Sequence, residues 1–309
     1  MAVYIPRPHP RPALWGGKLI KEYFHYADFP DDIGQSWAFS AQEGASNLIE
    51  NGGYAGRTLA GLWREKPEIF RSRFDRFPVI VSLVAPVEDL SIQIHPNARM
   101  AAEAGYAMGK NEAWYFLEAQ EGGDIVYGCR AKNEAELREM IAAGQWDELV
   151  ARLPVRQGDF VYLPAGMLHA LRKGSIVYEV QQAADITYRF FDYHRKGPDG
   201  KERELHLEQA IRCMDFGLTS SSAHPHQALE LLPHGTLATL IRNDSFCVRK
   251  LVLHAEAAMG FDGYQLMTVC RGAGAVNGMP AAMGQSFLVP AKEKITLTGD
   301  LTILMTGEE

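Results

Sequence analysis

The chain has 309 residues, enough for two ordinary domains or one large one, and its 47% hydrophobic and 22% charged residues are typical of globular proteins. The net charge of −7 gives no support to a nucleic-acid-binding surface, which needs clustered basic residues. No run approaches the roughly 18 apolar residues of a membrane span, and the N-terminus lacks a signal-peptide pattern. The four cysteines form no C-x-x-C pair. We therefore expect a cytoplasmic protein with reduced thiols and with neither a membrane nor a nucleic-acid partner.

The predicted elements are mostly short strands separated by Gly- and Pro-containing turns. Residues 1–60 are rich in Gly, Pro and aromatics and predict irregular segments and short strands. The β-branched run 77–86 predicts a buried strand, and 113–128 predicts two strands around a Gly turn. Further strands are expected over 156–193 and 235–309, and helices over 64–76, 98–107, 132–150 and 202–216.

This order of elements predicts a β-sandwich or barrel with helices added at its edges. The stretch 217–234 is rich in Ser, Pro and His and predicts a linker or a long surface connection. We therefore expect an N-terminal domain over 1–216 and a C-terminal domain over 235–309, joined by 217–234.

A short internal repeat supports two similar β domains. Residues 158–165 (GDFVYLPA) align without gaps with 284–291 (GQSFLVPA), and each proline is followed seven residues later by a leucine. Upstream, 114–128 resembles 264–278 in its turn glycines and its strand pattern. Such self-similarity indicates two copies of one β unit.

The two copies differ where polar residues stand. His169 lies five residues after the first proline, and Ile295 takes that place in the second copy. Glu112 precedes Trp114 as Asp262 precedes Tyr264, but Asp262 has no histidine nearby in the sequence. A histidine needed only for packing would not produce differences at several positions at once, so the first copy is predicted to carry a functional site.

The stretch SIQIHPN places Gln93 and His95 two residues apart on a predicted strand, where their side chains share one face. Together with Glu112 and His169 they offer nitrogen and oxygen ligands that suit zinc and would also accept iron, cobalt or manganese. The alternatives are an ordinary polar strand face, a core histidine and a solvated turn carboxylate.

Other ionisable groups follow the same predicted sheet. Lys110 lies two residues before Glu112, and Glu179, Asp185 and Arg189 come later. Surface ion pairs would explain most of them. Glu179 is harder to explain in that way, because it stands among apolar residues and a buried carboxylate is rare unless it is paired or functional.

Six segments together resemble the type I mannose-6-phosphate isomerases, in their short bacterial form, over nearly the whole chain. They are LWGGKL, IGQSWAFSA, LSIQIHPN, GKNEAWYFLEA, GDFVYLPAGMLHAL and EVQQAADITYRFFDYHR. The resemblance implies two cupin-type jelly-roll β-barrels with helical insertions, and a catalytic first barrel with one zinc per chain. It also implies the interconversion of mannose 6-phosphate and fructose 6-phosphate. One departure is Gln35, where related sequences usually have Glu.

By position, the resemblance implies that Gln93, His95, Glu112 and His169 are the zinc ligands. It implies that Arg189 is catalytic, that Lys110 and Glu179 line the active site, and that Ser91 contacts the substrate phosphate. For proton transfer through an enediol(ate), the candidate bases are Glu179, Lys110 and a zinc-bound water. Arg189, Lys110 and Arg195 are further candidates for binding the phosphate.

Two alternatives to this function remain. One is a cupin isomerase or epimerase of another sugar or sugar phosphate, and the other is a non-catalytic, metal-bearing sugar-binding protein. Lys110, Glu179 and Arg189 argue against the second, because a decayed site would be expected to lose such groups. We expect a monomer or a dimer whose partner is a small sugar phosphate.

Overall fold

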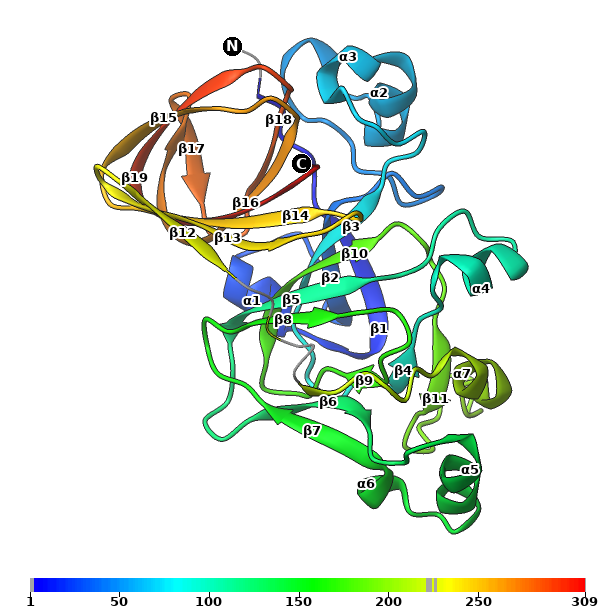
Figure 1. The fold of residues 1–309 in the computed structure, drawn as a ribbon. Coiled ribbons are helices and arrows are strands. Elements are labelled where there is room, and N and C mark those ends of the chain that lie inside the picture. The colour runs from blue at the N-terminus through cyan, green and yellow to red at the C-terminus, as the bar shows by residue number, and fades with distance from the viewer. Residues whose placement is uncertain (1–2, 221–223, 225–226, 309) are drawn as a thin grey trace.

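The computed structural model describes residues 3–220, 224 and 227–308 and is mainly β, with three antiparallel sheets and short helices (Figure 1). Two sheets face each other and form the first barrel, and the third curls into the second barrel. The predicted fold class, two jelly-roll barrels with helical insertions, is confirmed.

The first barrel is built from a six-stranded and a five-stranded sheet. The six-stranded sheet contains, in spatial order, β1 (His9–Gly17), β2 (Ile33–Phe39), β3 (Val79–Val84), β10 (Ile176–Gln182), β5 (Glu112–Glu118) and β8 (Phe160–Leu163). The five-stranded sheet contains β11 (Tyr188–Phe191), β4 (Ile92–Ile94), β9 (His169–Ala170), β6 (Asp124–Cys129) and β7 (Val150–Pro154).

The second barrel is one eight-stranded sheet. Its strands are β12 (Ala228–Leu232), β13 (Gly235–Arg242), β14 (Cys247–Leu253), β15 (Glu256–Gly260), β16 (Gln265–Val276), β17 (Met279–Ala282), β18 (Ser286–Val289) and β19 (Lys294–Gly307). The helices are α1 (Leu19–Phe24), η1 (Gly52–Tyr54), α2 (Leu59–Glu65), α3 (Pro67–Phe70), α4 (Ala98–Glu103), α5 (Glu134–Ala142), α6 (Trp146–Leu149) and α7 (Leu207–Cys213).

The alternation of side chains along β3, β5 and β10 decides what faces the inside of the first barrel. On β5, Tyr115 and Leu117 join a core shared with the second barrel, whereas Trp114 and Phe116 join the core between the two sheets of the first. Successive residues of a strand point to opposite faces. Glu112 therefore lies on the same face as Trp114, inside the first barrel.

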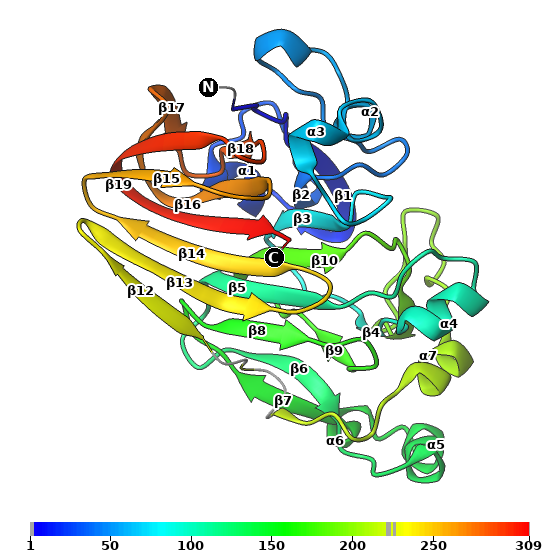
Figure 2. The ribbon, with the colours of Figure 1, turned by 45° about the horizontal axis from the view of Figure 1, so that its top comes forward.

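The outer face of the six-stranded sheet packs against the second barrel. Figure 2 shows β14 alongside β10 and β5, and one buried apolar cluster contains residues of both barrels, among them Tyr178 and Leu304. The buried hydroxyls of Tyr178 and Thr306 form a hydrogen bond of 2.7 Å across this contact.

The proposed domain boundaries at 1–216, 217–234 and 235–309 stay a prediction.

Three predicted helices are shorter or broken. In place of a helix over 64–76, α2 and α3 meet at Lys66, whose extended φ of −135° precedes Pro67 and interrupts the helix. The insert 132–150 splits into α5 and α6 at Gly144, which has a φ of +70°. The helix predicted over 202–216 begins only at Leu207.

Other predictions are partly right. The helix predicted over 98–107 ends at Glu103, and α1 lies in a region that was expected to be irregular. The predicted connection 217–234 contains β12, which pairs with β13; residues 221–223 and 225–226 lie outside the described residues. The strands predicted over 77–86, 113–128, 156–193 and 235–309 are present.

The internal repeat is present in the backbone. Gly158 and Gly284 both have a left-handed φ, of 89° and 88°, and each precedes a strand that pairs with the corresponding long strand, β8 with β5 and β18 with β16. Only glycine adopts this φ without strain. None of the four cysteines forms a disulfide, and none of the helices in the described part of the chain has the length and hydropathy of a membrane span.

Candidate metal centre

The predicted ligand residues come from both sheets of the first barrel and meet between them. Gln93 lies on β4, His95 directly follows that strand, and His169 begins the neighbouring β9, where it pairs in register with Gln93. Glu112 begins β5 of the facing sheet. Pro96 lacks the N–H that would continue the β4 ladder, so the strand ends where His95 turns inward.

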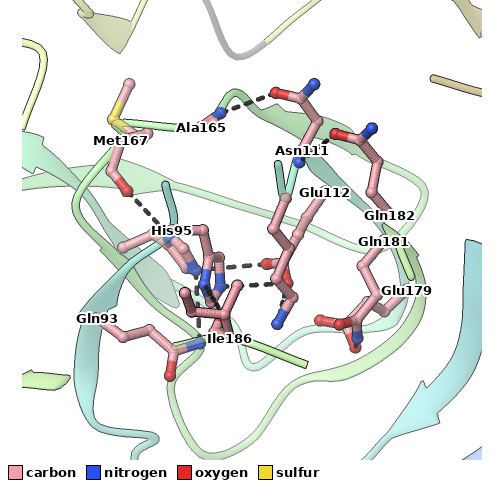
Figure 3. Close-up of polar contacts among 12 residues, drawn as sticks. Gln93, His95, Asn111, Glu112, Ala165, Met167, Glu179, Gln181, Gln182 and Ile186 are labelled. Atoms are coloured by element: carbon pink, nitrogen blue, oxygen red, sulfur yellow. Dashed lines mark hydrogen bonds and ion pairs between the residues drawn. The ribbon is translucent and has the colours of Figure 1, made fainter. Parts of the chain in front are cut away.

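The side chain of His95 points toward the carboxylate of Glu112 (Figure 3), and His169 contacts the same carboxylate. His95 Nε2 lies 3.2 Å from Glu112 Oε1, and His169 Nε2 lies 3.4 Å from Glu112 Oε2. One potential ligand atom from each residue lies within 4.8 Å of the other two. The three residues are only 1–2% exposed, so water does not solvate this group.

The backbone determines which nitrogen of each imidazole carries the proton. His95 Nδ1 lies 3.0 Å from the carbonyl oxygen of Ile186, and His169 Nδ1 lies 2.9 Å from that of Met167. A carbonyl oxygen only accepts, so each Nδ1 carries a hydrogen and donates it. Each Nε2 of a neutral imidazole then presents a lone pair toward Glu112.

Two lone pairs directed at a carboxylate repel unless a cation lies among them. The pKa of His95 is lowered to about 4, mainly by burial and to a smaller extent by the charge of Lys110, so this imidazole is neutral at pH 7. Burial alone would raise the pKa of Glu112, but the positive charge of Lys110 helps to hold it well below its usual range. His95 Nε2 and Glu112 Oε2 are buried without a hydrogen-bond partner among the described residues. This donor set fits a divalent metal ion.

Gln93 completes the group from the side of β4. Its Nε2 lies 3.5 Å from His169 Nε2, and its Oε1 lies 3.5 Å from the Ser91 hydroxyl. A half-turn of the amide would exchange these two atoms and direct the oxygen, which is the ligand atom, toward the imidazoles. Ser91 itself is buried next to the same strand.

Lys110 and Glu179 lie beside this cluster. Lys110 Nζ contacts Glu112 Oε1 at 3.2 Å. Glu179, on β10, accepts hydrogen bonds from the Ser82 hydroxyl at 2.7 Å, from Trp114 Nε1 at 2.9 Å and from Gln181 Nε2 at 2.8 Å. Burial and the nearby charge of Glu112 raise the pKa of Glu179, even though these donors favour its ionised form.

The side chains of the remaining predicted residues have other partners. Arg189 on β11 pairs in register with Gln93, but its Nη1 donates to the carbonyl oxygen of Glu204 at 2.7 Å. Arg195 donates to the carbonyl oxygen of Asp89 and to Asp192. Asp185 is exposed, and Gln35 lies on β2, where it accepts a hydrogen bond from the Trp37 indole.

A cleft of about 920 Å³ lies between the segment of α2 and α3 and the loop before β11. Its walls include Trp63 of α2, Tyr106 after α4, and Asp185. Asp185 precedes Ile186, whose carbonyl oxygen accepts the hydrogen bond from His95. The cleft therefore reaches the loop that supports one of the imidazoles.

Sequence reasoning missed the donors that hold Glu179. Ser82, Trp114 and Gln181 all lie on the face of the six-stranded sheet that points into the first barrel. The period-2 pattern of β3, β5 and β10 could have placed them on that face. Their contacts depend on the register of the three strands, in which Glu179 pairs with both Ser82 and Trp114.

Comparisons with known proteins agree with this geometry. The phosphomannose isomerase type I catalytic domain matches residues 11–125. A mannose-6-phosphate isomerase of Streptococcus mutans is 36% identical over 266 residues, which cover 85% of this chain and 83% of that protein. A mannose-6-phosphate isomerase of Bacillus subtilis is 37% identical over 250 residues, covering 80% of this chain and 78% of that one.

The chain belongs to the mannose-6-phosphate isomerase family. The family resemblance predicted from the six sequence segments is thus confirmed, and with it the expectation of an enzyme. A crystal structure of the mannose 6-phosphate isomerase from Bacillus subtilis superimposes with a TM-score of 0.95 at 33% identity and covers 99% of both chains. The isomerase fold therefore extends through both barrels.

The depressed pKa of His95 predicts how the stability of the metal-free isomerase depends on pH. Below pH 6.5 His95 becomes protonated in the unfolded chain, whereas in the folded chain it stays neutral down to about pH 4. The free energy of unfolding of chelator-treated protein should therefore fall as the pH is lowered through this window. Urea unfolding at several pH values measures it.

Two variants test whether His95 causes this pH dependence of the free energy of unfolding. His95→Gln should flatten the pH dependence between pH 6.5 and 5, whereas the largely exposed His254→Gln should keep the wild-type slope. An unchanged slope in His95→Gln would contradict the assignment of a neutral, buried imidazole.

Proposed function

We propose that the chain interconverts mannose 6-phosphate and fructose 6-phosphate, with one zinc ion held by Gln93, His95, Glu112 and His169. The observation that carries the proposal is the buried carboxylate between two imidazole lone pairs, close to a second buried carboxylate and a lysine. The names of the relatives from Bacillus subtilis and Streptococcus mutans supply the substrate.

The ligand set favours zinc over magnesium or calcium, because it contains two imidazole nitrogens, whereas those two ions prefer oxygen ligands. It has no thiolate and would leave coordination positions open, as catalytic zinc sites do. When bound, the ion would supply a Lewis acid that polarises sugar oxygens.

Aldose–ketose interconversion moves a proton between C2 and C1 of the sugar through an enediol(ate). The base must be fixed within hydrogen-bonding reach of that proton and have a pKa not far from the working pH. Glu179 meets the second requirement best of the candidates, since burial raises its pKa. Its three hydrogen-bond donors hold the carboxylate in one orientation.

Lys110 and Arg189 are assigned the role of stabilising the negative charge that develops on the sugar oxygens. Lys110 Nζ lies 3.2 Å from Glu112 Oε1, so its ammonium group is placed to stabilise negative charge beside the cluster. Arg189 is cationic at any working pH and would stabilise the enediolate.

The phosphate group is assigned to the start of β4. Ser91 is buried there, and Arg195 donates to the carbonyl oxygen of Asp89, two residues before Ser91. Arg189 lies on the strand that pairs with β4. These three side chains could offer hydroxyl and guanidinium donors, the groups that phosphate oxygens prefer, and Lys110 is the further candidate.

The cytoplasmic location of the protein and its monomeric or dimeric state stay predictions.

An activity assay tests the proposal. Zinc-loaded protein is expected to produce fructose 6-phosphate from mannose 6-phosphate, and chelation or His169→Ala should abolish product formation and the bound zinc together. His254→Ala, an exposed histidine of the second barrel, is the matched control and should keep full activity. A folded, zinc-loaded wild type without product would contradict the substrate and favour the isomerase or epimerase of another sugar.

The role of Glu179 is tested separately. Glu179→Gln should lower kcat by about 100-fold or more, because the amide cannot accept the proton, and should leave the bound zinc unchanged. Glu118→Gln makes the same change at a half-exposed carboxylate of β5 and should keep wild-type kcat. A Glu179→Gln variant with near wild-type kcat would assign the base to another group.

A further inference from the structure

A buried carboxylate joins two arginines directly after β11. Asp192 is 3% exposed. Its Oδ2 accepts from Arg203 Nε at 2.7 Å, and its Oδ1 accepts from Arg203 Nη2 at 2.6 Å and from Arg195 Nη2 at 2.5 Å. The guanidinium of Arg203 thus holds the carboxylate with two parallel bonds, a geometry that fixes both partners. Through Asp192, the same contact restrains Arg195.

The segment 203–206 also holds Arg189. The carbonyl oxygen of Glu204 accepts from Arg189 Nη1 at 2.7 Å. The backbone of His206 donates to the carbonyl oxygen of Arg189 at 2.8 Å, and His206 Nδ1 accepts from the Arg189 backbone N–H at 3.2 Å. One short stretch of chain therefore supports both arginines that are assigned to the substrate.

These contacts leave the Nε–H group of each arginine without an acceptor. Nε of Arg189 and Nε of Arg195 are buried and have no hydrogen-bond partner among the described residues. A buried N–H without an acceptor is unfavourable unless a ligand supplies one. Because Arg195 donates to the carbonyl of Asp89 and Arg189 pairs with Gln93, both unused donors belong to side chains that flank the start of β4, where Ser91 lies.

The charges around Asp192 match a phosphate monoester. Three guanidinium groups, of Arg189, Arg195 and Arg203, and the one carboxylate of Asp192 sum to a charge of +2. A phosphate monoester carries about −1.5 to −2 at pH 7. Two further carboxylates lie nearby, Glu88 at 3.7 Å from Arg195 and Glu204, whose charge acts on Arg189. Both are exposed, so water screens their charges.

We propose that Arg203 is a positioning residue for phosphate recognition. Through its paired bonds to Asp192, and through the segment 203–206 that it anchors, it holds Arg195 and Arg189 so that their free N–H groups receive the phosphate oxygens. Arg203 itself does not contact the substrate. This inference rests on the proposed function, which supplies the sugar phosphate.

The test compares Arg203→Met and Arg203→Lys with a matched arginine. Arg138 forms an equally paired ion pair with Glu208 at 2.8 Å, between α5 and α7, so Arg138→Met controls for the loss of such a pair elsewhere. For each zinc-loaded variant, KM and kcat for mannose 6-phosphate, the inhibition constant of inorganic phosphate, direct phosphate binding by calorimetry and the melting temperature are measured.

Arg203→Met should raise KM and the inhibition constant of phosphate about tenfold or more, and it should lower kcat by a smaller factor, because Arg189 is also assigned to the enediolate. Arg203→Lys keeps the charge but loses the planar fork, so it should raise both constants to an intermediate degree. Arg138→Met should match the wild type. If Arg203→Met does not fold, Arg203→Lys decides alone.

Wild-type phosphate affinity in the folded Arg203 variants, or a loss of kcat at unchanged KM, would overturn the inference. A wild type that binds phosphate but does not isomerise mannose 6-phosphate would contradict only the proposed substrate, and the calorimetric comparison would still decide the role of Arg203. A wild type that shows neither activity nor phosphate binding would overturn both.

Discussion

The carboxylate of Glu112 lies in a buried space where two imidazole lone pairs point at it. The carbonyl oxygens of Ile186 and Met167 require a proton on each Nδ1, so a neutral imidazole at either position presents an Nε2 lone pair to the carboxylate. Lys110 relieves the repulsion at Oε1 alone. The first barrel folds around a group of acceptors that a divalent cation would complete, and this requirement underlies the proposed chemistry.

Both sheets are needed to build this arrangement. The five-stranded sheet supplies His95 and His169, and the six-stranded sheet supplies Glu112 and Glu179. The second barrel contains the same β unit without the site. At the position of His169 it has Ile295, which is buried in an apolar core, and at the position of Glu112 it has Asp262, which is exposed and paired with Lys292. That barrel instead covers the outer face of the six-stranded sheet.

The sequence could predict the cluster because its residues sit at strand ends and differ between the two copies of the repeat. It could not predict what holds Glu179 and Arg189, because those contacts depend on strand register and on loops. The helix expected over 202–216 is the clearest case. Its first turns do not form, since Arg203 binds Asp192 and the backbone of Glu204 and His206 binds Arg189. Tertiary contacts there outweigh a helical pattern.

The central claim is that one zinc ion lies among Gln93, His95, Glu112 and His169. Diffraction from crystals of zinc-loaded protein, collected on both sides of the zinc absorption edge, locates the metal directly. The account predicts one anomalous peak per chain, within bonding distance of the Nε2 atoms of His95 and His169 and of a Glu112 oxygen. A peak at a cysteine or at the surface, with none between the two imidazoles, would contradict it.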